Sequence, residues 1–267
     1  MNMMRFTTMK TKLRKYPSIF LILLLAISSC FLTGCVNQHP KDSKKSSQGE
    51  SVETMLEITD PKEKQAVLNA KAKVKALSGN PRIVATSPAV ADICDKLDLD
   101  LVGVPKSSVS KIPSRYKKVK KVGLAMSPDM EIVSSLNPDW ILAPSSLETD
   151  LKPKFEELKN TEYAFLNLRS VQGMYRSAQE LGEIFGKQQE AEKMTKEFTT
   201  FYKSYTKRNK NKKHPKVLVL MGLPGSYVIA TENSYVGSLI KLAGGENVYQ
   251  NTDQEFLTVN TEDMKKK

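Results

Sequence analysis

A long helical pattern dominates the middle of this chain, over residues 170–213. Its apolar residues recur every three or four positions, with lysine, glutamate and glutamine between them, which is the period of one buried stripe on an amphipathic helix. The stripe consists of Met174, Ala178, Leu181, Phe185, Met194, Phe198, Phe201 and Tyr205. A continuous helix of this kind would span roughly 60 Å, more than one small lobe requires. We therefore predict a strut that joins two lobes, with Gly186 as a position where the helix can kink or break.

Short apolar stretches alternate with helical patterns on both sides of this strut. Strands are expected at residues 83–85, 101–104, 140–143 and 163–166 before it, and at residues 217–221 and 227–230 after it. Helical patterns separate them at residues 88–97, 129–136, 148–159 and 235–243. Such alternation is typical of a mostly parallel sheet that is covered on both faces. The sequence therefore predicts an α/β fold in which two α/β lobes are bridged by one long helix.

The same patterns give the expected boundaries of these parts. The N-terminal α/β lobe covers residues 81–168, the interlobe helix residues 169–213, and a partial C-terminal α/β lobe residues 214–267. Residues 35–80 form a tether and an extra helix, which starts with Asp60 as its cap, Pro61 in its first turn and Glu63 placed to reach back. That helix, over residues 61–77, either packs on the first lobe or acts as a spacer.

The first 34 residues have the pattern of a secretory signal. Five basic residues precede a continuous apolar run at residues 19–27, which is too short to span a bilayer. The run is followed by Leu32-Thr33-Gly34-Cys35, which looks like a bacterial lipobox. We therefore expect a signal peptide at residues 1–34, and Cys35 as the lipidated new N-terminus.

The number of cysteines and the net charge limit which disulfides and which partners the chain can have. Once Cys30 leaves with the signal and Cys35 carries lipid, only Cys94 remains, so an intramolecular disulfide is excluded. Removal of the signal lowers the formal net charge from +12 to +7. A basic cluster at residues 207–216 is compatible with nucleic acid, but we interpret it as the solvated end of a helix, where cations are favoured. No nucleic-acid partner is predicted.

Two polar features follow strands at the expected carboxyl edge of the first sheet. Ser87 and Pro88 start a helix directly after a strand, so that the free N–H groups of Ala89 and Val90 and the helix dipole favour an anion such as a ligand carboxylate. The alternative is that Ser87 only caps its own helix. The loop at residues 106–111, which includes Ser107, supplies further donors at the same edge, or is plain surface.

Met126 lies between Gly123 and Pro128, in a loop rather than on a helical stripe. A loop methionine between a strand and a helix either covers the core or offers a soft thioether ligand to haem iron. Catalysis has little support, because the only histidines are His39 in the tether and His214 at the end of the strut. The same scarcity argues against a histidine-rich zinc site, and no glycine-rich phosphate loop follows a strand. We predict no enzyme activity.

Taken together, these residues resemble the iron-complex substrate-binding lipoproteins of ABC importers, and the haem receptors in particular. The motifs that carry the resemblance are the lipobox, Ile83-Val84, Lys120-Lys121-Val122-Gly123, Met130-Glu131, Leu136-Asn137-Pro138-Asp139-Trp140-Ile141 and Gly244-Gly245-Glu246-Asn247-Val248. The match covers residues 82–264, and the helix at residues 61–77 looks additional. The resemblance implies a periplasmic-binding-protein-like fold with a single-helix hinge, which carries haem between its lobes.

The resemblance also implies roles for individual residues. Met126 would be an axial ligand of the haem iron, Ala89, Val90 and Ser107 would contact the haem propionates, and Glu131 and Glu262 would dock on arginines of the permease. The implied protein is a cell-surface lipoprotein of the Gram-positive type, held on the extracellular face of the membrane by its lipid. Its partners would be haem, the ABC permease and upstream cell-wall haem carriers.

One feature departs from the family pattern. The family's second axial ligand is a histidine in the second lobe beyond the Glu262 region, whereas this chain ends at Lys267. We therefore expect a C-terminally truncated sequence with one axial ligand. The alternatives left open are a ferric-siderophore-binding lipoprotein with the same fold, and a truncated remnant without a transport role.

Overall fold

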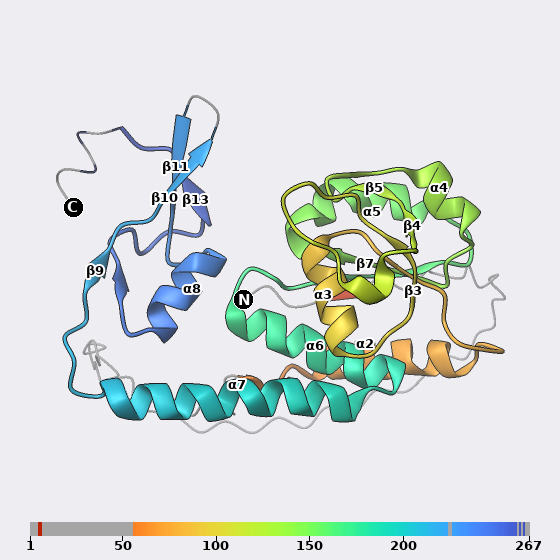
Figure 1. Cartoon of the computed structure of the whole chain (residues 1–267), viewed down its shortest axis with the longest axis horizontal. Coiled ribbons are helices and arrows are strands. Elements are labelled where there is room, and N and C mark those ends of the chain that lie inside the picture. Colours follow the sequence, from red (N-terminus) through yellow and green to blue (C-terminus); the bar gives the residue numbers. More distant parts are fainter. Residues whose placement is uncertain (1–4, 7–55, 224–225, 261, 263, 265–267) are drawn as a thin grey trace, which may run out of the picture. The chain divides into compact units, whose positions relative to one another are not determined.

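The computed structural model describes residues 5–6, 56–223, 226–260, 262 and 264 (Figure 1). The predicted tether and Cys35 lie outside these residues, as does the predicted signal peptide apart from β1 (Arg5–Phe6). Among the described residues, no helix combines the length and apolar character needed to cross a membrane.

A six-stranded sheet forms the centre of the N-terminal lobe, in the order β1-β8-β7-β2-β3-β4. Its parallel strands are β2 (Ile83–Ala85), β3 (Leu101–Val104), β4 (Lys120–Lys121), β7 (Trp140–Pro144) and β8 (Glu162–Leu166), and β1 pairs antiparallel with β8 at one edge. The four strands expected before the strut are confirmed. β4 ends the other edge with two exposed lysines, a device that discourages further pairing.

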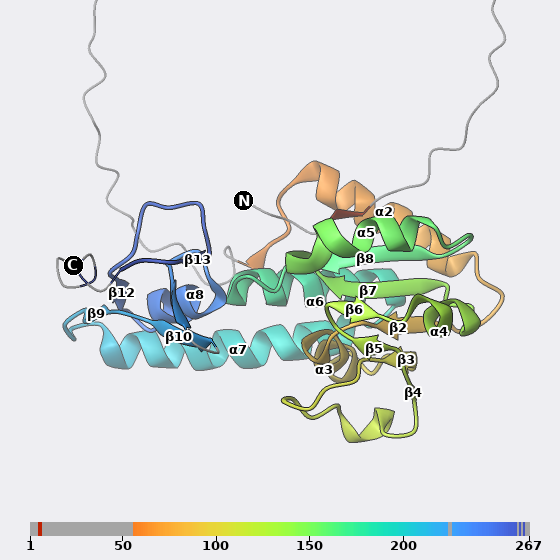
Figure 2. The same ribbon diagram turned by 90° about the horizontal axis from the view of Figure 1, so that it is seen from above.

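Helices cover both faces of this sheet, as the alternating pattern predicted (Figures 1 and 2). Alternate strand residues face two separate cores. One core contains residues of α2 (Pro61–Lys75), α3 (Pro88–Lys96) and α6 (Val171–Phe185), and the other contains residues of α4 (Met130–Ser135) and α5 (Glu148–Glu156). A short 3₁₀ turn, η1 (Ser114–Tyr116), lies between β3 and β4, and another, η2 (Ser145–Leu147), lies between β7 and α5.

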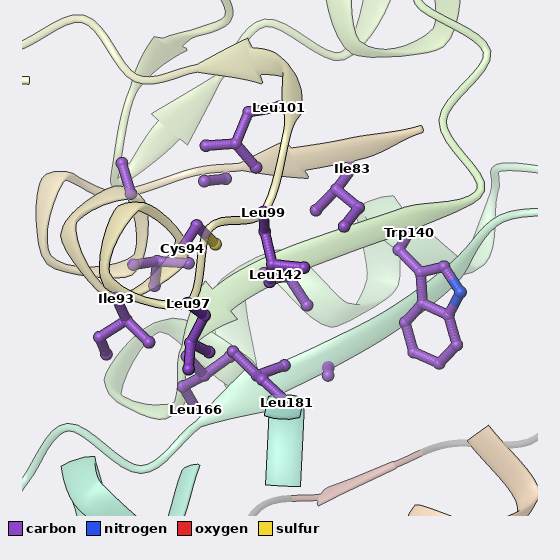
Figure 3. Packing of buried hydrophobic residues seen from close by; sticks show 14 of the residues in the cluster. Ile83, Ile93, Cys94, Leu97, Leu99, Leu101, Trp140, Leu142, Leu166 and Leu181 are labelled. Carbon is purple, nitrogen blue, oxygen red and sulfur yellow. The ribbon is translucent and has the colours of Figure 1, made fainter. Parts of the chain in front are cut away.

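The first of these cores explains why Cys94 is not a reactive thiol. Cys94 is fully buried on α3 beside Ile93 and Leu97, and it packs with strand residues such as Leu142 and Leu166 (Figure 3). Burial raises the pKa of its thiol to about 12, so that the reactive thiolate is scarce at neutral pH. The predicted inward face of this helix is therefore confirmed.

The extra helix α2 packs on the first lobe and is not a spacer. Val67 and Ala70 of α2 belong to the same core as α3 and α6. Lys71 forms an ion pair with Glu183 of α6, and Lys73 Nζ lies 2.5 Å from Glu162 Oε1 of β8. The Asp60 side chain caps the helix by accepting the Lys62 N–H at 2.7 Å, as the sequence predicted.

The helical pattern at residues 169–213 is divided into two helices at Gly186, where the sequence indicated a kink or break, so the continuous span predicted for the interlobe helix is too long. α6 ends at Gly186, which adopts a left-handed conformation (φ 71°), and α7 (Gln188–Asn209) follows it. The two helices approach closely, since a Cβ on Gly182 would lie 2.7 Å from Ala191 Cβ. α6 thus contributes its apolar stripe to the first lobe, and α7 alone, roughly 33 Å long, leads onward.

The described residues after α7 include two small sheets and a helix between them in the sequence. β9 (Lys216–Val217) pairs parallel with β12 (Glu246–Asn247), while β10 (Leu220–Leu223), β11 (Ser226–Ala230) and β13 (Phe256–Leu257) form an antiparallel sheet. The continuous strand expected at residues 217–221 is therefore divided between two sheets. The predicted strand at residues 227–230 and helix α8 (Tyr235–Leu242) are confirmed.

This C-terminal part is joined to α6 and α7 by side-chain contacts as well as by the chain. Ser238 Oγ of α8 accepts the Val171 N–H at 3.1 Å, and Arg169 forms an ion pair with Glu255. Tyr205 Oη of α7 donates to the Ala243 carbonyl oxygen at 2.8 Å. These contacts place the start of α6 and the end of α7 against the α8 region.

Candidate ligand-binding edge of the first sheet

Three neighbouring parallel strands, β2, β3 and β4, end at one edge of the first sheet, and each is followed by one of the predicted site features. β2 leads to Ser87 and the start of α3, β3 to the loop with Ser107, and β4 to the hairpin with Met126. β2 also pairs with β7 on its other side, so that connections diverge at this point of the sheet. Ligands of open parallel sheets bind at such a position, outside the carboxyl ends of the strands.

The start of α3 offers one exposed residue with a helical N–H group. Ser87 caps the helix by accepting the Val90 N–H at 3.3 Å, and Val90 itself is buried. Ala89 is exposed, and its N–H belongs to the first turn, where no intrahelical acceptor exists. Ser87 therefore caps its own helix. Of the two amides considered in the sequence analysis, that of Ala89 belongs to an exposed residue and that of Val90 to a buried one.

The loop after β3 is tied to the hairpin after β4. The Lys106 N–H donates to the Gly123 carbonyl oxygen at 2.6 Å, which brings the two connections side by side. Ser107 is half-buried, and its hydroxyl oxygen accepts the Ser110 N–H at 3.0 Å, so its side chain first stabilises its own loop. Val109, at the tip of this loop, is 96% exposed.

Met126 lies in a short hairpin that holds it away from the core. The hairpin consists of β5 (Gly123–Leu124) and β6 (Ser127–Pro128), and Gly123 enables its entry with a positive φ of 96°. The Met126 side chain is 74% exposed, so it does not cover the core. A thioether in this position is available to a ligand at the sheet edge. Sequence reasoning singled out Met126 but not Leu124, which is 58% exposed in the same hairpin.

A charge network fixes the connection between β3 and β4. The Arg115 guanidinium donates to Asp98 Oδ1 at 2.7 Å and to Asp100 Oδ1 at 2.9 Å, while Lys187 donates to Asp98 Oδ2 at 2.9 Å. Hydrogen bonding from Lys187, and then from Arg115, holds the pKa of Asp98 below its usual value. The network joins η1, the end of α3 and the start of α7 near the amino ends of β3 and β4, at the side of the sheet opposite to the candidate edge.

The two glutamates predicted to dock on a permease are both exposed. Glu131 lies in the first turn of α4, which Asp129 caps by accepting the Glu131 and Ile132 N–H groups at 3.1 Å. Glu262 is helical and follows β13 in the C-terminal part. They therefore belong to different parts of the chain, as expected, and neither follows the carboxyl end of β2, β3 or β4.

His214 is the only histidine among the described residues. The His214 ring Nδ1 lies 2.6 Å from the Gly244 carbonyl oxygen, where it joins the end of α7 to the turn after α8. No group of three or more histidine, cysteine, aspartate or glutamate side chains gathers as a metal site within the described part of the chain. Met126 and Ala89 are both exposed at the candidate edge.

The sequence model of the periplasmic binding protein family matches residues 83–267, and the chain belongs to that family. Among individual relatives, the chain is similar to the high-affinity heme uptake system protein IsdE of Staphylococcus aureus, with 40% identity over 188 residues. This alignment covers 70% of the chain and 64% of the relative, so the chain spans just under two thirds of the length of the curated relative.

Solved structures give the same fold. An ABC transporter substrate-binding protein from Listeria monocytogenes EGD-e has a TM-score of 0.66 and 45% identity, and the match covers 70% of this chain and 72% of that one. S. aureus IsdE complexed with heme has a TM-score of 0.64 and 40% identity, with 69% and 71% covered. The predicted fold class, with α/β structure of the periplasmic-binding-protein kind, is confirmed.

Proposed function

We propose that this chain binds haem at the edge formed by the carboxyl ends of β2, β3 and β4, with Met126 as a ligand of the iron. The observation that carries the proposal is the exposed Met126 thioether at this edge, in a chain that is 40% identical to a haem uptake protein. A thioether is a soft ligand that suits haem iron, particularly in the ferrous state. The Ala89 amide and the positive end of the α3 dipole would favour one propionate, with Val90 and Ser107 near it.

The proposed role is capture and delivery without catalysis. Glu131 and Glu262 would contact arginines of an ABC permease, because exposed carboxylates on separate parts of the chain give a charge-complementary dock. Cys35 would carry the lipid that holds the protein on the extracellular face of the membrane, where upstream haem carriers would supply it. Support for this account comes from the sequence pattern of residues 1–35, with its basic start, apolar run and Leu32-Thr33-Gly34-Cys35, and from membership of a family of binding proteins.

Haemin titration of the full chain tests the proposed ligand. We expect a Soret band that shifts in Met126→Ala, while Leu124→Ala, from the same hairpin and also exposed, retains the wild-type spectrum. The fold should survive both changes because neither side chain is buried. An unchanged spectrum in Met126→Ala would show that Met126 is not a ligand of the iron. Binding of a ferric siderophore without any Soret band on haemin would favour the siderophore-binding alternative.

A further inference from the structure

The end of α7 and the segment after it carry an unusual concentration of positive charge. Residues 198–231 contain seven lysine or arginine residues and no aspartate or glutamate. We use the name basic end of α7 for six of them, which are Lys207, Arg208, Lys210, Lys212, Lys213 and Lys216. All six side chains are exposed. Like charges at this spacing repel one another, so the cluster does not contribute to folding by itself.

The fold accounts for only part of this charge. Lys207 and Arg208 lie in the last turn of α7, where the helix dipole favours cations. The other four follow the helix and gain little from its dipole, which acts within the last turn. Within the described part of the chain, none of the six forms an ion pair. The positive charge is therefore available to a partner outside the chain.

An exposed aromatic ring accompanies the cations. Phe201 is 60% exposed on α7, and its ring stacks on Tyr205 with 6.1 Å between ring centroids. Phe201 and Arg208 are seven residues apart, which places them on the same face of the helix. Large apolar side chains beside several lysines and arginines are typical of helices that lie on an anionic membrane surface.

We propose that the basic end of α7, together with Phe201, binds the headgroups of anionic phospholipids. The cations would be attracted to the negative surface, and the Phe201 ring would enter the boundary between headgroups and acyl chains. A soluble phosphate polymer would use the same cations but would offer no apolar layer to Phe201. Dependence on this ring therefore distinguishes a membrane from other polyanions.

Vesicle co-sedimentation of the full chain tests the proposal, with vesicles of phosphatidylcholine alone or mixed with phosphatidylglycerol. One variant changes the six cations of the basic end to glutamine. Its matched control changes six other exposed lysines to glutamine, which are Lys62, Lys64, Lys75, Lys117, Lys118 and Lys159. Both variants lose the same charge and keep the apolar run at residues 19–27, which contributes equally to vesicle binding in all samples.

Each cation near an anionic surface changes binding by about fivefold, so the loss of even two effective cations should weaken binding to the mixed vesicles at least tenfold. The control should lose much less, and Phe201→Ala should weaken vesicle binding without changing the affinity for soluble polyphosphate. If both six-residue variants lost vesicle binding equally, net charge alone would explain the effect, and the proposal would be overturned. Vesicle binding that does not depend on Phe201 would also overturn it, since this would indicate a general polyanion site. Haemin titration of the same variants should remain unchanged, so failure here is separable from failure of the haem proposal.

Discussion

Glu63 of α2 and Glu180 of α6 meet as two carboxyl groups in the buried contact between their helices. Glu63 is 6% exposed and Glu180 is 1% exposed. Burial, followed by hydrogen bonding and like charge from Glu63, raises the pKa of Glu180 far above its usual value, and the positive charge of Arg176 opposes this only in part. At neutral pH, Glu180 is therefore protonated.

The raised pKa of Glu180 predicts that stability falls as pH rises. Because the folded pKa of Glu180 lies above its unfolded value, its contribution is complete below about pH 4.5 and is lost as pH rises toward the folded pKa. The free energy of unfolding should fall by roughly 1 kcal/mol per pH unit through the neutral range relative to Glu180→Gln, which cannot ionise. Urea unfolding at several pH values measures this difference.

Glu183, one turn further along α6, provides a control of opposite sign. Hydrogen bonding from Lys71, and then from Gln188, lowers the pKa of Glu183 below its usual value. The contribution of Glu183 to the free energy of unfolding is present above the unfolded pKa and is lost in acid. The free energies of unfolding of Glu183→Gln and wild type should therefore differ mainly above pH 4.5. The same slope for Glu180→Gln and wild type would show that Glu180 ionises normally in the folded state.

Gly237 is predicted to tolerate no side chain. A Cβ there would lie 2.1 Å from the Thr231 carbonyl oxygen and 2.7 Å from two backbone carbons of Glu232. These atoms belong to the backbone and cannot rotate away, so Gly237→Ala should lower the free energy of unfolding by about 1–3 kcal/mol or more. Gly79→Ala is the matched control, because a Cβ at Gly79 meets nothing within 4 Å. Thermal melts of both variants should separate them, and equal melting temperatures would contradict the tight contact at Gly237.

Cys35 is predicted to be the lipid attachment site. The lipobox pattern at residues 32–35 directly follows an apolar run, and Cys94 is buried with a pKa of about 12. Metabolic palmitate labelling in a bacterial host should be lost in Cys35→Ser, and the protein should be released from the membrane. Cys94→Ser should keep its label. If Cys35→Ser still incorporated palmitate, the lipid would be attached at another residue and the prediction would be wrong.

Glu131 and Glu262 are predicted to affect haem uptake but not haem binding. Both carboxylates are exposed, and neither belongs to the sheet edge with Met126. Glu131→Ala should therefore retain the wild-type haemin titration and lose permease-dependent uptake by several-fold, as rim charges at an interface do. Glu148→Ala, which removes a half-buried carboxylate in the first turn of another helix, serves as the comparison. Weaker haemin binding by Glu131→Ala, with normal uptake, would refute the assignment.

The amino-acid sequence by itself determined most local elements of the first lobe. Ser87 and Pro88 fix the start of α3 through a cap and a preset φ angle, and the apolar runs at residues 83–85 and 140–143 are continuous because both faces of the sheet are covered. The loop position of Met126 also followed from sequence, since Gly123 and Pro128 bound it. These features depend on residues that are close along the chain, so their patterns are legible without the fold.

Tertiary structure alone decided the features that depend on distant partners. Gly186 divides the long helical pattern, but only the close approach of Gly182 and Ala191 turns α7 back against α6. Glu63 was expected to serve the start of its own helix, yet packing of α2 on α6 buries it beside Glu180. The run at residues 217–221 is divided between two sheets because β9 pairs with the distant strand β12, whereas β10 pairs with β11, which follows it directly. Periodicity records which face of an element is apolar, whereas the identity of the surface that covers this face is set by contacts between residues far apart in the sequence.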